Sequence, residues 1–149
     1  MIRILIADDH AIVRSGLKQI VSSAPDLEVA GEATTSQEVL NLIRKHPWDI
    51  IVLDINMPGR SGIETLKEIK RDFPRLPVLM LSMYPEDQYA VRALKAGAAG
   101  YLTKESAPEE LLIAIRKVLR GGKYISATVA EHLVFALDVN PNKPLHMLL

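Results

Sequence analysis

Short apolar runs alternate along this chain with segments in which apolar residues recur every three or four positions. Three of the runs are continuous and apolar, which is the pattern of strands that are buried on both faces of a parallel sheet. The other two are shorter or mixed and are bounded by turn residues. The pattern predicts five strands, near residues 2–7, 28–32, 50–53, 78–81 and 100–102.

The segments between these runs have the spacing of amphipathic helices. Apolar residues share one face in four groups: Val13, Leu17, Ile20 and Val21; Val39, Leu40 and Ile43; Ile63, Leu66 and Ile69; Leu111, Leu112, Ile115, Val118 and Leu119. Capping-box spacing marks three helix starts: Thr35 with Glu38, Ser61 with Glu64, and Ser106 with Glu109. A fifth helix, predicted at 86–96, has a mostly alanine apolar side, so we expect it to bury little surface and to be mobile.

Strands and helices in this order predict an α/β fold, a doubly wound five-stranded parallel sheet with helices on both faces. We expect the flavodoxin-like strand order 2-1-3-4-5. One domain should occupy residues 1–122, because Gly121 and Gly122 end the last long helix. Residues 123–149 are expected to hold a short helix that starts near Thr128 and Glu131, followed by the linker-like DVNPNKP.

Composition narrows the function classes. The chain has 149 residues, 48% of them hydrophobic and 24% charged, which is an ordinary globular balance. It has no cysteine, so disulfide and thiol chemistry are excluded. Lys plus Arg equals Asp plus Glu at 18 each, so there is no basic excess for binding a phosphate backbone. No apolar run approaches the ~20 residues of a membrane span, and we expect a soluble cytoplasmic protein with no membrane contact.

Polar residues follow the predicted strands at one edge of the sheet. Asp8 and Asp9 follow the first strand, Asp54 the third, Ser82 the fourth and Lys104 the fifth. Ligands of open α/β sheets bind outside the carboxyl ends of the strands where strand order reverses, here between strands one and three. Three carboxylates should therefore share one crevice.

Three close carboxylates repel one another unless a proton or a cation lies between them. Ligands that are all oxygen favour a hard ion such as Mg²⁺, which typically keeps several waters and takes a phosphate oxygen as a further ligand. Lys104 and Ser82 could hold the other side of a phosphoryl group by charge and by a hydrogen bond. The layout favours phosphoryl transfer to a carboxylate.

At this point the chain resembles a two-component response regulator receiver domain over residues 1–122. The motifs that carry the resemblance are ADDH (7–10), VLDINMPGRSG (52–62), LSMYPED (81–87) and AGAAGYLTKES (96–106). The resemblance implies that Asp54 is the phosphoacceptor and also a Mg²⁺ ligand. It implies a direct Mg²⁺ ligand at Asp9, a ligand that acts through water at Asp8, and a metal-binding backbone carbonyl at Asn56.

The same resemblance implies which residues change conformation when Asp54 is phosphorylated. Ser82 matches a hydroxyl that turns towards the phosphoryl group, Tyr101 an aromatic that changes rotamer with it, and Lys104 a lysine that pairs with the phosphoryl oxygens. A sensor histidine kinase would be the phosphodonor. Many receivers have proline after this lysine, but Glu105 follows it here; a non-proline cis bond would cost ~3–4 kcal/mol. The peptide geometry is therefore left open.

The segments DDHAIVRSGL and GAAGYLTKESAPEEL are most similar to the NarL/FixJ-type branch, whose members carry a C-terminal helix-turn-helix domain. The resemblance implies that phosphorylation changes conformation, promotes a homodimer and controls transcription through a DNA-binding domain that is not in this chain. We expect a receiver and linker separated from that domain, or else a natural stand-alone receiver. The dimer face, helices four and five or helices one and five, stays open.

The same residues also allow structural or other catalytic interpretations. Asp8 and Asp9 could simply cap the first helix, and His10 is expected beside the pocket without a chemical role. A Mg²⁺-dependent aspartyl phosphatase is disfavoured because a second acid usually stands two residues after the nucleophile, where this chain has Asn56. A phosphorylation-independent binding module is disfavoured by the intact site. We expect no turnover enzyme, only self-phosphorylation and self-dephosphorylation.

Overall fold

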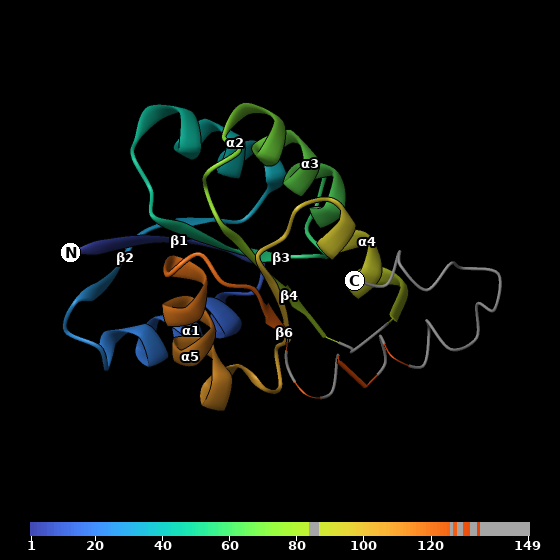
Figure 1. Ribbon diagram of the computed structural model, residues 1–149. Helices are drawn as coiled ribbons and strands as arrows, with labels where there is room; N and C mark the ends of the chain where they lie inside the picture. The colour runs from blue at the N-terminus through green and yellow to red at the C-terminus, as the bar shows by residue number, and fades with distance from the viewer. Residues whose placement is uncertain (84–86, 126, 128–129, 132–133, 135–149) are drawn as a thin grey trace, which may run out of the picture.

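In the computed structural model, a six-stranded parallel sheet lies between helices on its two faces (Figure 1). The structure describes residues 1–83, 87–125, 127, 130–131 and 134. The strands are β1 (Ile2–Ala7), β2 (Leu27–Ala33), β3 (Ile50–Asp54), β4 (Val78–Ser82), β5 (Gly100–Thr103) and β6 (Tyr124–Ile125). Their spatial order is β2-β1-β3-β4-β5-β6, and every neighbouring pair is parallel.

The predicted order 2-1-3-4-5 is confirmed, but the prediction of five strands is one short. β6 extends the sheet at the edge beside β5, with Gly100 opposite Tyr124 and Tyr101 opposite Ile125. This strand lies beyond residue 122, where the sequence predicted the end of the domain. Two residues are too few to show a strand period, so only the pairing with β5 reveals the strand.

The helices are α1 (Ala11–Ser22), α2 (Ser36–Lys45), α3 (Gly62–Asp72), α4 (Asp87–Lys95) and α5 (Ala107–Leu119). Two predicted caps are confirmed, since the Thr35 and Ser61 hydroxyls each accept a hydrogen bond from the backbone N–H three residues on, at 3.2 Å. Ser106 occupies the N-cap position of α5 as predicted, but its side chain makes no cap hydrogen bond. Its hydroxyl donates instead to the Thr103 carbonyl at 3.0 Å, because the tight turn after β5 brings that oxygen within reach.

Two apolar layers enclose the sheet (Figure 1). Alternate strand residues such as Leu53 and Met80 pack with α2, α3 and α4. The intervening residues such as Val52 and Leu81 pack with α1 and α5. Strands β3 and β4 are buried along their whole length, as their continuous apolar runs predicted.

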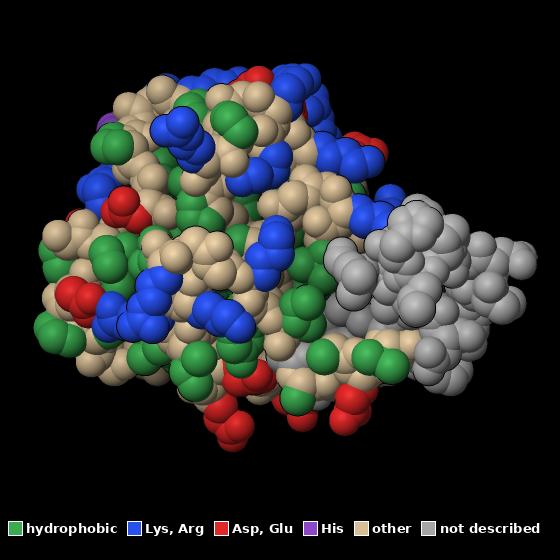
Figure 2. Space-filling model, viewed as in Figure 1, with side chains coloured by type: hydrophobic (Ala, Val, Ile, Leu, Met, Phe, Trp, Pro, Cys, Tyr) green, Lys and Arg blue, Asp and Glu red, His purple; other side chains and the backbone are tan. Residues whose placement is uncertain are grey.

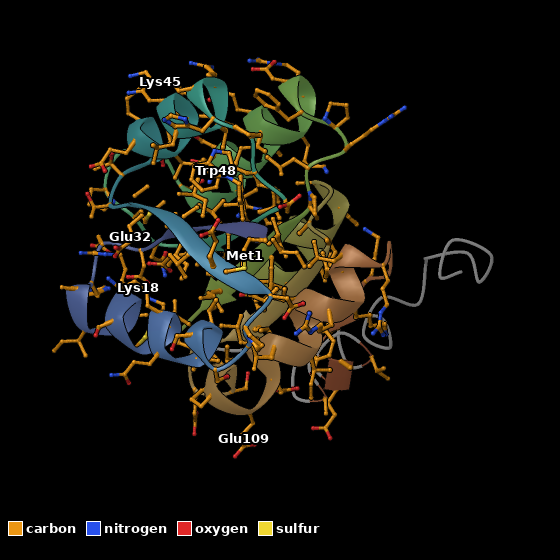
Figure 3. The ribbon with its side chains drawn as sticks, turned by 90° about the vertical axis from the view of Figure 1, so that its left-hand side faces the viewer. Met1, Lys18, Glu32, Lys45, Trp48 and Glu109 are labelled. Atoms are coloured by element: carbon orange, nitrogen blue, oxygen red, sulfur yellow. The ribbon has the colours of Figure 1, made fainter. Side chains whose placement is uncertain are left out.

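Trp48 lies between β2 and α2 and donates its indole N–H to the Leu42 carbonyl at 2.9 Å (Figure 3). The predicted helix at 86–96 corresponds to α4, whose mobility stays a prediction. The short helix expected after Thr128 falls largely outside the described residues. No helix in the described part of the chain is long and apolar enough to cross a membrane.

Candidate functional site

The polar residues predicted at the strand ends do meet at one edge of the sheet. Parallel register aligns the ends of β1 and β3 (Ala7 opposite Leu53) and those of β4 and β5 (Ser82 opposite Thr103). The side chain of Asp8, just after β1, and that of Asp54, the last residue of β3, are both essentially inaccessible to solvent. A short apolar strand thus delivers each carboxylate to the same buried position.

Lys104 brings the positive charge to this position. Its ammonium Nζ lies 2.8 Å from Asp8 Oδ2 and 3.3 Å from Asp54 Oδ2, and its side chain is 9% exposed. The Lys104 backbone N–H donates to the Ser82 carbonyl at 2.7 Å, which ties the loop after β5 to the end of β4. The Lys104–Glu105 peptide is trans, which settles the geometry that the sequence left open.

The pocket's electrostatics are dominated by burial. Burial raises the pKa of the Asp54 carboxyl and the Asp8 charge raises it further, whereas the Asn56 backbone N–H, which donates to Asp54 Oδ1 at 3.2 Å, and the Lys104 ammonium oppose the shift. Burial also acts on Lys104 and by itself would lower its pKa. The two carboxylates outweigh burial, so the Lys104 pKa is raised. Both shifts arise because Asp54 and Lys104 are buried and interact with each other and with Asp8 in place of water.

Asp54 and Lys104 lie beside an acidic cluster that could hold a metal ion. Oxygens of Asp8, Asp9 and Asp54 and a ring nitrogen of His10 all lie within 4.8 Å of one another. The buried Oδ2 atoms of Asp8 and Asp54 both face the Lys104 ammonium, which lies within hydrogen-bonding distance of Asp8 Oδ2. Three carboxylates against one ammonium leave an excess of negative charge, so the donor set fits a divalent cation with a preference for oxygen ligands.

The plainer interpretation of the acid pair is partly correct. Neither Asp8 nor Asp9 is the residue that caps α1, since His10 holds that position and makes no side-chain cap. Asp8 Oδ1 does accept the His10 backbone N–H at 2.8 Å, and Arg14 donates to the Asp8 carbonyl at 2.8 Å. Asp8 therefore shapes the loop between β1 and α1 while its other oxygen faces Lys104.

The loop after Asp54 is held against the site by close backbone packing. Gly59 turns the chain with a φ of 94°, and the Gly62 N–H donates to the Ile55 carbonyl at 2.9 Å. A Cβ at Gly62 would lie 2.5 Å from Ile55 Cα and 2.8 Å from the Asp54 carbonyl oxygen. Nothing local in the sequence indicates this contact between Gly62 and the loop.

A buried hydroxyl pair that the sequence did not single out supports the same loop. Thr65 Oγ1 donates to Ser36 Oγ at 2.8 Å, and Ser36 Oγ donates to the Arg60 carbonyl at 3.0 Å. Both hydroxyl residues are buried, one on α2 and one on α3. The pair fixes the loop between β3 and α3, and its sequence signal, two polar residues on otherwise apolar faces, is weak.

The predicted switch residues lie next to the site on the α4 side. Ser82 ends β4 and is buried beside Asp54 and Lys104 on the neighbouring strand ends. Tyr101 is fully buried in the layer that also contains Ala90 and Ala93 of α4. The placement suits the predicted roles of Ser82 and Tyr101 without testing them.

The rest of the surface carries mixed charge. Arg14 and Lys18 on α1 bind Glu32 on β2 at 3.1 and 3.0 Å (Figure 3). On the face seen in Figure 2, Lys and Arg side chains lie mostly over the upper and central part, and Asp and Glu side chains lie mostly along the lower edge.

The sequence of this chain is similar to sequences of known response regulators. Residues 4–116 match the family model of the response regulator receiver domain. Over 143 residues the chain is 34% identical to the response regulator UvrY of Escherichia coli (strain K12), covering 96% of this chain and 65% of UvrY. The chain therefore spans slightly less than two thirds of that curated relative.

Solved structures agree. A two-component response regulator of the LuxR family from Aurantimonas sp. SI85-9A1 superposes with a TM-score of 0.87 at 34% identity, covering 91% of this chain and 97% of that one. The isolated receiver domain of RcsB from Salmonella enterica serovar Typhimurium, solved with the phosphomimetic BeF3⁻, gives 0.83 at 30% identity, covering 89% and 98%. RcsB dimers bound to DNA give 0.84 at 29% identity, covering 89% and 68%. This chain belongs to the response regulator receiver domain family.

Proposed function

We propose that this chain accepts a phosphoryl group on Asp54 from the phosphohistidine of a sensor histidine kinase and changes conformation in response. The observation that carries the proposal is the buried Asp54 carboxylate, with Asp8 beside it and the Lys104 ammonium 3.3 Å from its Oδ2. A carboxylate that only capped a strand end would need neither a second buried acid nor a buried lysine.

The transfer is a displacement at phosphorus. An Asp54 oxygen forms a bond to phosphorus as the bond between phosphorus and the kinase histidine nitrogen breaks. The electron pair of that bond returns to the ring, which leaves as a neutral imidazole because its other nitrogen carries a proton. Lys104 offsets the charge that collects on the phosphoryl oxygens, and the Ser82 hydroxyl can donate to one of them.

Asp8, Asp9, Asp54 and the Asn56 carbonyl are the residues that would hold Mg²⁺. A bound Mg²⁺ would neutralise the crowded carboxylates and the incoming phosphoryl oxygens. The protein's own contribution is positioning: the hydroxyl pair of Ser36 and Thr65 fixes the loop that bears Asn56. We infer that the chemistry is limited to phosphorylation and hydrolysis of Asp54 itself.

The conformational response should involve the 82–104 region. A phosphoryl group that pairs with Lys104 and the Ser82 hydroxyl adds charge next to the buried Tyr101 and α4, and such a change can bias a two-state element. By analogy with RcsB, which forms dimers on DNA, we infer that phosphorylation promotes a homodimer and that DNA contact belongs to a domain beyond this chain. Transcription control would then be the output.

The test is phosphorylation by a small acyl phosphate in Mg²⁺, followed by intact-protein mass spectrometry. We expect one added phosphoryl group on the wild-type chain, and none on Asp54→Asn or without a divalent cation. The matched control is Asp72→Asn, the same substitution on an exposed acid at the end of α3, and it should be phosphorylated normally. Equal labelling of the wild type and Asp54→Asn would refute the proposal.

A further inference from the structure

His10 has no role in the proposed function, yet its imidazole lies against the acidic pocket. It stands between β1 and α1, and its side chain is 61% exposed. Its Nδ1 lies 3.2 Å from Asp8 Oδ1 and 3.2 Å from Asp9 Oδ1. The imidazole therefore contacts both acids expected to bind the metal, from the solvent side.

These separations are those of atoms that share one metal ion. Two neighbouring ligands of an octahedral ion with bonds of about 2.1 Å lie about 3.0 Å apart, and two ligands of a tetrahedral Zn²⁺ site lie about 3.3 Å apart. The 3.2 Å distances from His10 Nδ1 to both carboxylates fall between these values. The candidate ligand atoms of His10, Asp8, Asp9 and Asp54 all lie within 4.8 Å of one another.

A second observation points independently to a cation at this place. Asp8 Oδ2 and Asp54 Oδ2 are buried, and in the described part of the chain they face a single ammonium, Lys104 Nζ, at 2.8 and 3.3 Å. Their one ion-pair partner there, Lys104, leaves the negative charge of the pocket in excess. The pocket therefore attracts a cation whatever His10 does, and His10 affects which cation is held best.

We propose that His10 is a metal-selectivity residue that adds an imidazole ligand to the pocket and lets it take first-row transition ions such as Zn²⁺ more tightly than Mg²⁺. Imidazole suits these ions, whereas Mg²⁺ prefers oxygen and keeps its waters. Binding through Nδ1 would replace one water of an ion already held in the pocket. The inference rests on the proposed function only in using the same pocket.

The alternative role of His10 is a hydrogen bond that steadies the two acids, and it makes a different prediction. A ring that merely donates to Asp8 and Asp9 would influence Mg²⁺ and Zn²⁺ alike. A ring that ligates the ion would influence Zn²⁺ far more than Mg²⁺. The substitution His10→Gln separates the two roles, because Gln keeps a hydrogen-bond donor of similar reach and loses the imidazole nitrogen.

The experiment is calorimetric titration of the metal-free chain with MgCl2 and with ZnCl2, for the wild type, His10→Gln and a control, His46→Gln, whose exposed histidine follows α2. We expect His10→Gln to lose about tenfold or more in Zn²⁺ affinity at this site and less than about threefold in Mg²⁺ affinity. His46→Gln should leave both affinities of the site unchanged. Equal losses for the two ions, or no loss for Zn²⁺, would overturn the proposal.

A second measurement reads the ligand directly. Pulsed electron paramagnetic resonance of bound Mn²⁺ should show coupling to an imidazole nitrogen in the wild type, and none in His10→Gln. Failure here is distinguishable from failure of the proposed function. If Asp54 is phosphorylated in Mg²⁺ but the nitrogen coupling is absent, only the role of His10 is wrong; if Asp54 is not phosphorylated at all, the proposed function falls first.

Discussion

Gly62 is the position where one added methyl group should disturb both the fold and the site. It is the first residue of α3 and packs on the backbone of the loop that follows Asp54. A Cβ there would lie 2.5 Å from Ile55 Cα and 2.8 Å from two carbonyl oxygens, whereas unbonded carbon atoms prefer about 3.5–4.0 Å. Because the opposing atoms are backbone, about 1 Å must be gained by moving the loop or the helix.

Overpacking of this kind costs about 1–3 kcal/mol of unfolding free energy. Alanine's higher helix propensity returns less than about 1 kcal/mol at a first helical position. We expect Gly62→Ala to lose about 1–2 kcal/mol, which for a chain of this length lowers the Tm by about 2–8 °C. If Asp54 is the phosphoacceptor, the displaced loop should also slow its phosphorylation by roughly 10–100-fold.

Gly16→Ala is the matched control. Gly16 lies inside α1, and a Cβ there would meet no atom within 4 Å. The substitution should therefore stabilise the chain by about 0.5–1 kcal/mol and leave phosphorylation unchanged. Urea unfolding followed by circular dichroism measures both variants. If Gly62→Ala unfolds at the same urea concentration as the wild type or a higher one, the close contact does not constrain the loop.

Four other predictions concern ionisation and polar contacts. The Asp54 pKa is raised in the metal-free chain, so Lys104→Met, which removes an opposing charge, should raise it further in a carbon-13 NMR titration. The Asp54 pKa is higher in the folded chain than in the unfolded chain, so the ionised carboxylate destabilises the fold as pH rises through both values. Asp54→Asn should therefore be more stable than the wild type to urea at pH 7. Equal stability would show that the ionised carboxylate carries no such cost. Ser36→Ala should lose about 1–3 kcal/mol in urea unfolding because two buried hydrogen bonds lose their partner; a loss below about 0.5 kcal/mol would show that the loop relaxes. The Asp26 carboxyl, which is paired with Arg116, should titrate with a pKa of about 2 by NMR and return towards 3.8 in Arg116→Ala.

Local patterns predicted the elements because the physics behind them is local. An apolar run such as 50–53 is buried on both faces wherever a parallel sheet forms, and a cap such as Thr35 bonds a backbone N–H only three residues away. Ser106 shows the limit of such arguments. It has the cap spacing and the N-cap position, but its hydroxyl donates to the Thr103 carbonyl, an equally local acceptor, and accepts no bond from the first turn of the helix.

The sequence by itself determined which side chains reach the site, because each one follows an apolar strand and parallel strands end at one edge. Only the tertiary structure decided how these side chains meet. The ion pair between Lys104 and Asp8, the backbone contact of Gly62, and the pairing of β6 with β5 depend on the register and packing of segments that no local pattern relates. The same holds for His10: its position beside the acids was predictable, but the 3.2 Å distances that suit a shared metal ion come from the path of the loop between β1 and α1.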